Sequence, residues 1–328
     1  MLSEAESGSP EFWASETPDA VAVVKNNSSM TYAEWNHQAN RVADALSKLG
    51  LQAGDRIGMR FRIDFPWFVI QRALQKLDVV QVAVNWKLTP DEALYILKDS
   101  GAKGLACDDV DASKWGELDC GFLVTVNQAK YTAGHRLEDL IEDGNAEPRF
   151  GPLRANFILY TSGTTGAPKG VPPMDPATAD INRLIRYGAS VGKVPRVPDN
   201  GVVLMSLPVH HGAGPAAAAS CCARGGTAVL LDPYDAEEAM RLIQKHRVQV
   251  WTAVPTMLLR VQALSSEIFE SYDISSITAL SIGAAVVPFT LKTWIIEKFG
   301  PVLYEAYGCS EAGMISFITP EDQLKKPG

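Results

Sequence analysis

The sequence has little that would hold it to a polyanion or inside a membrane. It carries 30 lysines and arginines against 38 aspartates and glutamates, for a formal net charge of −8. Its longest cluster of basic residues is the pair Lys325-Lys326. No apolar run reaches the roughly 18 residues that a membrane-spanning helix needs. We therefore predict neither an electrostatic nucleic-acid-binding surface nor a transmembrane segment.

Cysteines are also few, and their spacing matches no metal site. The chain has five of them, an odd number, at Cys107, Cys120, Cys221, Cys222 and Cys309. Such a set is typical of a reducing compartment rather than of a disulfide framework. The segment Met1–Pro10 is acidic and polar, so it lacks the basic and apolar parts of a secretory signal peptide. We expect a cytoplasmic protein.

What the chain does have is enough apolar sequence for a large core. It has 328 residues, of which 46% are hydrophobic and 21% charged. This composition argues against disorder, and the length suits two domain-sized units.

In the first half, apolar strand-like segments alternate with helical ones. Thr31 and Glu34 form a capping box that predicts a helix over about residues 32–49, and Pro90 begins another that Gly101 ends. The first 30 residues are predicted to be an irregular arm with a strand at 20–24. The remaining predicted elements are strands at 56–61, 79–84, 102–107 and 122–126 and a helix at 65–77.

The second half repeats this alternation. Strands are predicted at 202–207, 227–231, 248–254, 277–282 and 302–305, and helices at 215–223, 236–245, 255–264 and 288–299. Continuous apolar strands separated by helices indicate parallel sheets covered on both faces. We therefore predict an α/β fold with two doubly wound, mostly parallel sheets. The first α/β layer is expected over about residues 51–195, and the second over 1–50 together with 196–318.

The segment 160–170, Tyr-Thr-Ser-Gly-Thr-Thr-Gly-Ala-Pro-Lys-Gly, carries the strongest chemical signal. Its glycines allow close backbone approach, while its hydroxyl and backbone N–H groups can form an anion site. Lys169 adds a cation for the outer phosphates of a nucleotide. From the residues alone, a ligand-free surface loop rich in Gly, Ser and Thr is the alternative. The spacing differs from G-x-x-x-x-G-K-[ST], which disfavours a P-loop kinase or ATPase. The phosphate-binding residues expected here are Thr161, Ser162, Gly163, Thr164, Thr165, Gly166 and Lys169.

This segment closely resembles the signature of the adenylate-forming superfamily, which includes acyl- and aryl-CoA synthetases, peptide-synthetase adenylation domains and beetle luciferases. Three further segments match in order. Residues 208–214, Pro-Val-His-His-Gly-Ala-Gly, resemble the family's Pro-x-x-His-x-x-Gly. Residues 283–285, Gly-Ala-Ala, stand where the family has Gly-Gly-Ala, and residues 307–311, Tyr-Gly-Cys-Ser-Glu, are similar to Tyr-Gly-x-Thr-Glu. The resemblance covers about residues 30–328.

The resemblance implies roles for particular residues. Tyr307 is expected to stack on adenine, opposite the backbone of 283–285, and Glu311 to bind Mg²⁺ on the phosphate oxygens. Ser310 takes the place of the usual Thr at the α-phosphate. His211 is placed at the junction of carboxylate and phosphate. The nucleotide contacts implied are Gly283, Ala284, Ala285, Glu305, Ala306, Tyr307, Gly308 and Ser310. The catalytic residues implied are His211, Lys169, Ser310 and Glu311. The pocket for the acid is implied at His210, His211, Gly212, Val254, Gly283 and Gly308.

The implied reaction is attack of a carboxylate on the α-phosphorus of ATP, which gives acyl-AMP and pyrophosphate and then a CoA thioester. ATP, Mg²⁺ and CoA are the implied cofactors. The small side chains of 216–222 leave volume without charge, which favours an apolar or aromatic acid as the small-molecule substrate.

Family members continue into a C-terminal domain, which is the expected intramolecular partner. That domain holds the ribose-binding Asp and a catalytic Lys, so we expect this incomplete N-terminal AMP-binding domain to form acyl-AMP slowly by itself. The alternative function is a nucleotide- or acyl-binding module without turnover.

Overall fold

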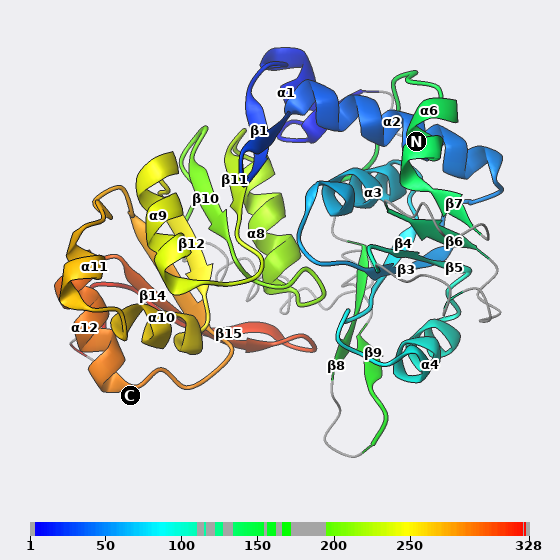
Figure 1. The fold of residues 1–328 in the computed structure, drawn as a ribbon. Coiled ribbons are helices and arrows are strands. Elements are labelled where there is room, and N and C mark those ends of the chain that lie inside the picture. Colours follow the sequence, from blue (N-terminus) through cyan, green and yellow to red (C-terminus); the bar gives the residue numbers. More distant parts are fainter. Residues whose placement is uncertain are drawn as a thin grey trace. The chain divides into compact units, whose positions relative to one another are not determined.

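A computed structural model describes residues 4–109, 115, 122–126, 134–153, 156–161, 166–171, 195–323 and 325. The chain forms two compact units. Unit 1 comprises Met1–Val23, Ser28–Pro173 and Pro208–Ala216, and unit 2 comprises Val24–Asn27, Met174–Leu207 and Ala217–Gly328. Figure 1 shows the course of the chain through helices and strands.

The N-terminal half of the described chain contains the elements α1 (Pro10–Glu16), β1 (Val21–Lys25), β2 (Ser28–Thr31), α2 (Tyr32–Lys48), β3 (Arg56–Arg60), α3 (Phe65–Lys76), β4 (Val80–Ala83), α4 (Pro90–Ser100), β5 (Gly104–Cys107), β6 (Leu123–Thr125), β7 (His135–Arg136), α6 (Leu137–Asp143), β8 (Phe157–Thr161) and β9 (Lys169–Val171). Strands β3 to β9 form one sheet in the order β7-β6-β5-β3-β4-β8-β9. Its strands are parallel except for β9, which runs antiparallel to β8.

The C-terminal half contains the elements β10 (Val202–Met205), α8 (Ala213–Cys222), β11 (Thr227–Leu230), α9 (Ala236–His246), β12 (Val250–Ala253), α10 (Pro255–Gln262), α11 (Ser266–Glu270), β13 (Ala279–Gly283), α12 (Phe289–Phe299), β14 (Leu303–Cys309) and β15 (Gly313–Ile318). The second sheet has the order β15-β14-β13-β12-β10-β11-β1-β2. Strands β11, β10, β12, β13 and β14 are parallel, and β15 is antiparallel to β14. The predicted α/β fold with two mostly parallel sheets is confirmed.

Two predicted helix starts are confirmed by their capping geometry. Thr31 Oγ1 accepts a hydrogen bond from the Glu34 N–H at 3.1 Å, and the Thr31 N–H donates to Glu34 Oε2 at 2.8 Å. Thr89 and Glu92 make the same reciprocal pair at the start of α4. Gly101 ends α4 with φ of 65°, a left-handed conformation that glycine adopts without strain.

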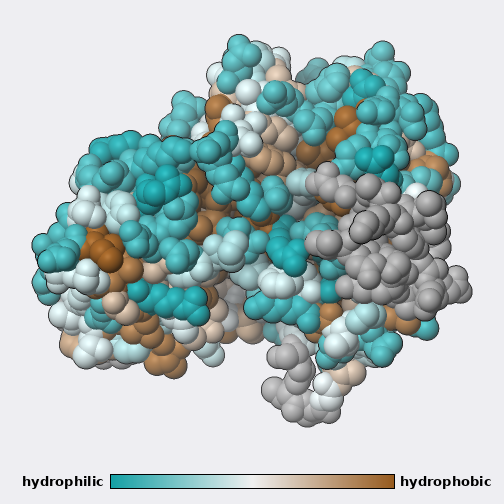
Figure 2. All heavy atoms as spheres, in the orientation of Figure 1, coloured by the Kyte–Doolittle hydropathy of each residue, from teal (hydrophilic) through white to brown (hydrophobic). Residues whose placement is uncertain are grey.

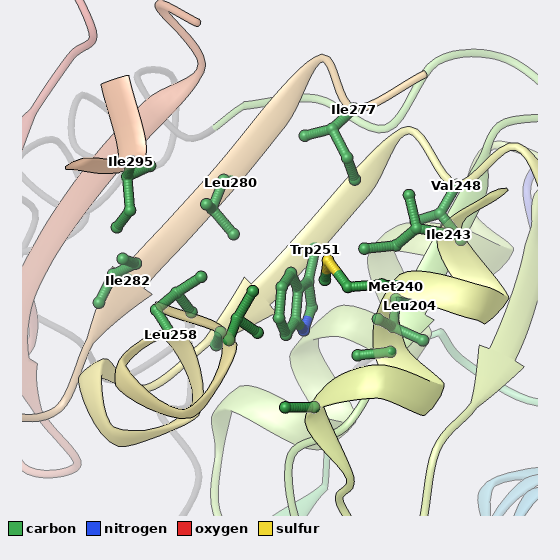
Figure 3. Close-up of a cluster of buried hydrophobic side chains, with 14 of the residues drawn as sticks. Leu204, Met240, Ile243, Val248, Trp251, Leu258, Ile277, Leu280, Ile282 and Ile295 are labelled. Atoms are coloured by element: carbon green, nitrogen blue, oxygen red, sulfur yellow. The ribbon is translucent and has the colours of Figure 1, made fainter. Parts of the chain in front are cut away.

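The core of unit 2 explains why its central strands are mostly apolar. Trp251 on β12 is fully buried, and its Nε1 donates to Ser206 Oγ at 3.0 Å. Figure 3 shows side chains from β10, β12 and β13 meeting side chains of α9 and α10 around this indole. The buried residues labelled there are Leu204, Met240, Ile243, Val248, Trp251, Leu258, Ile277, Leu280, Ile282 and Ile295.

The N-terminal arm differs from the prediction. Residues 10–16 form helix α1, because Ser9 Oγ caps the Phe12 N–H at 3.1 Å and Pro10 suits the first helical position. Residues 1–50 are predicted to belong to the second α/β layer as one segment, but the structure divides them. Strands β1 and β2 belong to the second sheet, whereas α2 packs against α3 and α6 of unit 1.

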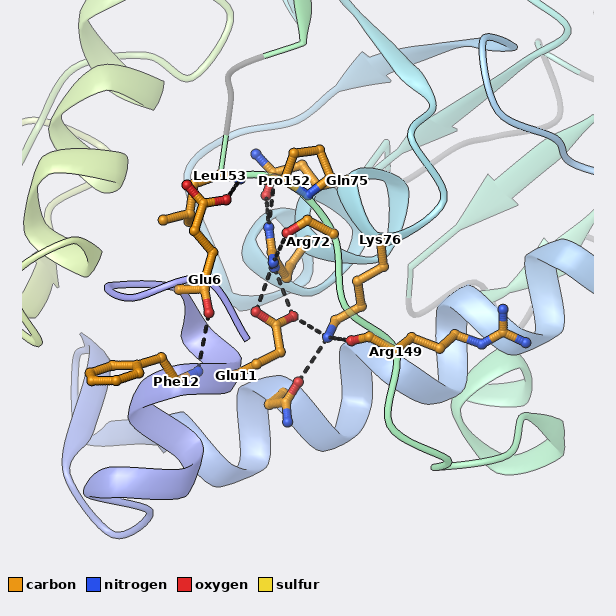
Figure 4. A network of polar contacts seen from close by, with 12 residues as sticks. Glu6, Glu11, Phe12, Arg72, Gln75, Lys76, Arg149, Pro152 and Leu153 are labelled. Carbon is orange, nitrogen blue, oxygen red and sulfur yellow. Dashed lines mark hydrogen bonds and ion pairs between the residues drawn. The ribbon is translucent and has the colours of Figure 1, made fainter. Parts of the chain in front are cut away.

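A buried ionic network holds α1 in unit 1 (Figure 4). The Glu11 carboxylate, in a residue that is 5% exposed, accepts two hydrogen bonds from the Arg72 guanidinium at 2.9 and 2.7 Å and also pairs with Lys76. Arg72 further donates to the carbonyls of Gly151 and Pro152, at 2.8 and 3.1 Å. Glu11 therefore links α1 to α3, and Arg72 links α3 to the segment that leads into β8.

Hydrophobic side chains on the face seen in Figure 2 are mostly interspersed among hydrophilic ones. The most exposed large apolar residues are Leu49, Tyr95, Leu259, Val286, Phe289, Tyr307 and Ile315. Val286 is 90% exposed and Tyr307 67%. Among the described residues no helix is both long and apolar enough to cross a bilayer.

Asp44 on α2 gives the fold a specific acid sensitivity. Its carboxylate contacts Lys48 Nζ, Arg149 and the Asn145 N–H within 2.9 Å. The hydrogen bonds from Lys48 and Asn145 lower the pKa of Asp44 from 3.8 to about 2. Because the folded-state pKa is the lower one, this stabilisation is present above the unfolded pKa and is lost as the pH falls through the folded pKa.

We therefore expect Asp44→Asn to lower the free energy of unfolding more at about pH 6 than at about pH 3. Urea unfolding of both proteins at the two pH values measures this difference. A deficit of the same size at both values would show that the charge of Asp44 does not contribute.

Candidate functional site

The segment with the strongest phosphate-binding signal forms a β-hairpin stem in unit 1. Strands β8 and β9 pair antiparallel, with Thr161 opposite Lys169 and Tyr160 opposite Gly170. Lys169 is therefore the first residue of a strand, and its side chain is exposed. Gly166 has φ of 150°. The expected phosphate contacts Ser162, Gly163, Thr164 and Thr165 lie outside the described residues.

The loop that carries the two histidines lies beside the same hairpin at Gly212. Gly212 belongs to the loop after β10, and Leu159 belongs to β8. A Cβ at Gly212 would lie only 3.1 Å from Leu159 Cδ1, so this loop passes directly beside β8. His210 is buried and His211 exposed, with ring centroids 4.5 Å apart. Unit 1 thus brings together the histidine segment and the strand that leads to Lys169.

The pKa values of both imidazoles lie below the usual 6.5, which favours the neutral form near pH 7. Burial lowers the pKa of His210 to about 3, with further lowering from His211, Lys87 and Arg60. His211 is more exposed than His210, and partial burial of its ring also lowers its pKa. His210 Nδ1 is a buried nitrogen that has no hydrogen-bond partner among the described residues. The pair therefore offers neutral nitrogens for hydrogen bonding.

In unit 2 the residues expected around adenine come together where β13 and β14 lie side by side. Gly283 pairs in register with Ala306, so the 283–285 segment begins next to the residue before Tyr307. A Cβ at Gly283 would lie 2.7 Å from the Ala306 carbonyl oxygen, which excludes a side chain there. Ala284 adopts φ of 67°, which turns the chain out of β13. Tyr307, the residue after Ala306, is 67% exposed.

The position of Tyr307 differs in one respect from the prediction. The strand expected over 302–305 continues to Cys309 and pairs with β15, with a register shift between Tyr307 and Gly308. Tyr307 therefore lies inside a β-hairpin and not beyond a strand end. Ser310 and Glu311 form the exposed turn of this hairpin.

Glu305 has a structural partner. Its Oε2 lies 2.5 Å from Nζ of Lys292, a residue of α12 that is 4% exposed. The carboxylate neutralises this buried cation, so its assignment as a nucleotide contact stays a prediction. Val254, expected in the acid pocket, is half-buried and directly precedes α10.

Comparison with known proteins identifies the family. The family model for AMP-binding enzymes matches residues 11–328. The chain belongs to this family. Its curated relatives include the mitochondrial medium-chain acyl-CoA ligase ACSF2 of Mus musculus, 25% identical over 94% of this chain and 55% of the relative. The long-chain-fatty-acid–CoA ligase FadD13 of Mycobacterium tuberculosis is 30% identical over 91% of this chain and 58% of the relative. The chain thus spans little more than half the length of these relatives.

A solved structure of an N-terminal domain has the same fold. The N-terminal domain of FACL13 from Mycobacterium tuberculosis aligns with a TM-score of 0.78 and 26% identity, covering 96% of this chain and 79% of that one. The o-succinylbenzoate CoA synthetase MenE of Bacillus subtilis, solved with an acyl-adenylate, aligns with a TM-score of 0.78 and 23% identity. That alignment covers 99% of this chain and 63% of MenE.

In this AMP-binding enzyme, the part of the chain that the structure describes holds no cluster of three or more His, Cys, Asp or Glu side chains suited to a metal ion. Ser310 and Glu311, in the exposed turn of the β14–β15 hairpin, supply a hydroxyl and a carboxylate. Such a set suits a magnesium ion that arrives on the phosphates of ATP, since Mg²⁺ is usually bound through one or two carboxylates and substrate oxygens.

One supporting residue was missed by sequence reasoning. Arg60, at the end of β3, donates to the carbonyls of Asn85 and Leu88 at 2.6 and 3.1 Å, and pairs with Asp109 at 2.8 Å. It thereby fixes the loop that carries Lys87 towards His210. Its only sequence signal is an arginine at the end of a strand.

Proposed function

We propose that the protein is an ATP-dependent acid–CoA ligase that activates a carboxylic acid as acyl-AMP. The observation that carries this proposal is the packing of the histidine segment against β8, the strand whose hairpin presents Lys169. Unit 1 supplies both Lys169, a cation suited to the outer phosphates, and His211, whose neutral imidazole suits a carboxylate. Relatives named as acyl-CoA ligases support the same class.

The chemistry asks the protein to hold two anions that repel one another. A carboxylate oxygen attacks the α-phosphorus of ATP, the bond to the β-phosphate oxygen breaks, and pyrophosphate leaves. Lys169 neutralises charge on the outer phosphates, and Mg²⁺ enters with ATP. His211 donates a hydrogen bond at the junction of carboxylate and phosphate. Such positioning and charge stabilisation supply much of the catalysis of group transfer.

The adenine is assigned to unit 2. Tyr307 is exposed and directly follows Ala306, the strand partner of Gly283, an arrangement that suits stacking of a flat base. Ser310 and Glu311 follow in the hairpin turn, where a hydroxyl and a carboxylate serve the α-phosphate and Mg²⁺. These roles agree with those that the family resemblance implies.

The acid is proposed to be apolar or aromatic. Helix α8 presents small side chains, with Ala216, Ala219 and Ser220 exposed. None of these three carries a charge that would pair with a substrate amine. In the proposed second step, CoA accepts the acyl group as a thioester and AMP leaves.

Pyrophosphate exchange with a panel of apolar and aromatic acids tests the proposal. Acid-dependent incorporation of labelled pyrophosphate into ATP is the expected result. Calorimetry with ATP on the same protein reports binding alone. ATP binding without exchange for any acid would favour the alternative, a nucleotide-binding module without turnover.

Lys169→Ala is expected to weaken binding of ATP·Mg²⁺ by roughly threefold to tenfold while leaving AMP binding nearly unchanged. The reason is that the ammonium group is assigned to the β- and γ-phosphates, which AMP lacks, and charge-assisted contacts to phosphate are among the stronger hydrogen bonds. Calorimetric titration with each nucleotide measures both affinities.

Lys245→Ala, an exposed lysine of α9 in unit 2, is the matched control and should change neither affinity. Equal losses for ATP and AMP in Lys169→Ala would contradict the assignment of Lys169 to the outer phosphates.

A further inference from the structure

The β8–β9 hairpin extends beyond the sheet to which it belongs. Strand β8 pairs with β4 only at Phe157 and Ile158, and β9 is an edge strand whose partner is β8. Residues 159–161 and 169–171 therefore form a two-stranded ribbon, which Figure 1 shows extending away from the sheet beside α4. A two-stranded ribbon is marginally stable without further packing, so contacts outside the sheet, those to α4 among them, help to hold Lys169 in place.

Two tyrosine hydroxyls make these contacts, one on each side of the hairpin loop. Tyr160 of β8 donates to Asp99 Oδ2 of α4 at 2.6 Å. Tyr95 of α4 donates to the carbonyl oxygen of Pro168, the residue before Lys169, at 3.3 Å. Burial and the Asp99 carboxylate raise the pKa of Tyr160, so its hydroxyl stays protonated and remains a donor.

The Tyr160 ring also holds the opposite strand. A Cβ placed on Gly170 would lie 3.1 Å from Tyr160 Cζ and 3.2 Å from Cε2. The ring thus lies across the backbone of the residue that follows Lys169. Gly170 allows this approach because it has no side chain.

Helix α4 is a firm support for the hairpin. Ala93, Ile96 and Leu97 are buried in the core of unit 1, while Tyr95 and Asp99 stay on the exposed side. Its start is fixed by the Thr89–Glu92 capping box, and Arg60 holds the preceding loop through the Leu88 carbonyl. Displacing α4 to follow the hairpin would disrupt this core.

We infer that Tyr160 and Asp99 are positioning residues, with Tyr95 in support, which hold Lys169 in the direction needed for the outer phosphates of ATP. This inference rests on the proposed function, because it assigns the pair to nucleotide binding through Lys169. A purely structural pair would affect the stability of the fold, or the affinity for every nucleotide equally. A positioning pair affects the triphosphate selectively.

The experiment compares binding of ATP·Mg²⁺ and AMP to the 328-residue chain and its variants by calorimetry. Tyr160→Phe keeps the ring over Gly170 and removes only the hydroxyl. It is expected to weaken ATP binding by roughly threefold to tenfold, the effect of an imperfectly placed charge-assisted contact. Its affinity for AMP should stay within about twofold of that of the unaltered chain. Its urea midpoint should equal that of the unaltered chain within experimental error.

Two further variants sharpen the comparison. Asp99→Ala should reproduce the loss seen in Tyr160→Phe, whereas Asp99→Asn retains an acceptor oxygen and should restore most of the affinity. Combining Tyr160→Phe with Asp99→Ala should cost little more than either change alone, because both remove one interaction. Tyr272→Phe is the matched control, since it removes a similar tyrosine–carboxylate bond of 3.1 Å to Glu237 in unit 2.

The outcomes separate this inference from the function on which it rests. If Lys169→Ala weakens ATP binding selectively but Tyr160→Phe does not, the positioning role is wrong and the proposed function stands. Equal losses of ATP and AMP affinity in Tyr160→Phe also overturn it. If the unaltered chain binds neither nucleotide, both the proposed function and the inference fail.

Discussion

Replacing Glu11 by alanine is expected to lower the free energy of unfolding by about 3–5 kcal/mol, the range for breaking a buried ion pair from one side. The loss is large because the Arg72 guanidinium, 1% exposed, would stay charged in the interior without a carboxylate. Burial lowers the pKa of Lys76 to about 8 even beside Glu11, so Lys76 would give up much of its charge in the variant. Burial raises the pKa of Glu11, but the charges of Arg72 and Lys76 outweigh this effect and leave it below 4.5. Urea unfolding followed by circular dichroism measures the change.

Glu16→Ala is the matched control for this variant. Glu16 closes the same helix α1 but is exposed, so its removal should change stability by no more than about 0.5 kcal/mol. Because the pKa of Glu11 is depressed, its contribution is present above the unfolded pKa and is lost as the pH falls through the folded pKa. A Glu11→Ala protein as stable as the Glu16→Ala protein would refute the role of the network in stability.

Tyr307→Ala is expected to weaken AMP and ATP binding alike, by about 1–3 kcal/mol, the scale of stacking between a base and an aromatic ring. The loss should be shared because both nucleotides carry the adenine, whereas Lys169 distinguishes them by their phosphates. The ring is 67% exposed, so truncating it removes little of the core. Calorimetric titration of the variant with each nucleotide gives the two losses.

Two variants control this experiment. Tyr307→Phe keeps a stacking face and should bind AMP almost as well as the unaltered chain. Tyr272→Ala removes another tyrosine of unit 2, away from the β14–β15 hairpin, and should leave both affinities unchanged. An unchanged AMP affinity in a folded Tyr307→Ala protein would place the adenine elsewhere.

The fold class was predictable because its determinants are local. Strands such as Val202–Met205 are apolar throughout, and this pattern indicates burial on both faces. Helix starts at Tyr32 and Pro90 follow from capping residues that are adjacent in sequence. The residue types therefore specify both where elements begin and how each packs.

Short elements and hairpins were less predictable. Helix α1 has only seven residues, and its stability comes from the contacts of Glu11 with a helix about 60 residues later in the chain. Strands β9 and β15 belong to hairpins whose pairing depends on the strand opposite. A pattern within one segment does not reveal such partners.

The same limit applies to the site. The motifs gave Lys169, the two histidines, Gly283 and Tyr307, because each lies in a recognisable run of residues. They gave no indication of Asp99, whose partner Tyr160 is 61 positions away in sequence. Nor did they show that burial holds His210 neutral, because that state depends on the loops packed around the ring.

The central claim is that this AMP-binding enzyme holds a carboxylic acid and an adenylate together for activation. Its most direct test is the affinity for an acyl-sulfamoyl adenosine, a stable mimic of acyl-AMP, compared with AMP, because the comparison requires no turnover. Mimics of reactive intermediates bind at least about a hundredfold more tightly than simple ligands. We predict a gain of that order for a mimic with an apolar or aromatic acyl group. A mimic that binds no more tightly than AMP, for any acyl group tried, would contradict carboxylate activation.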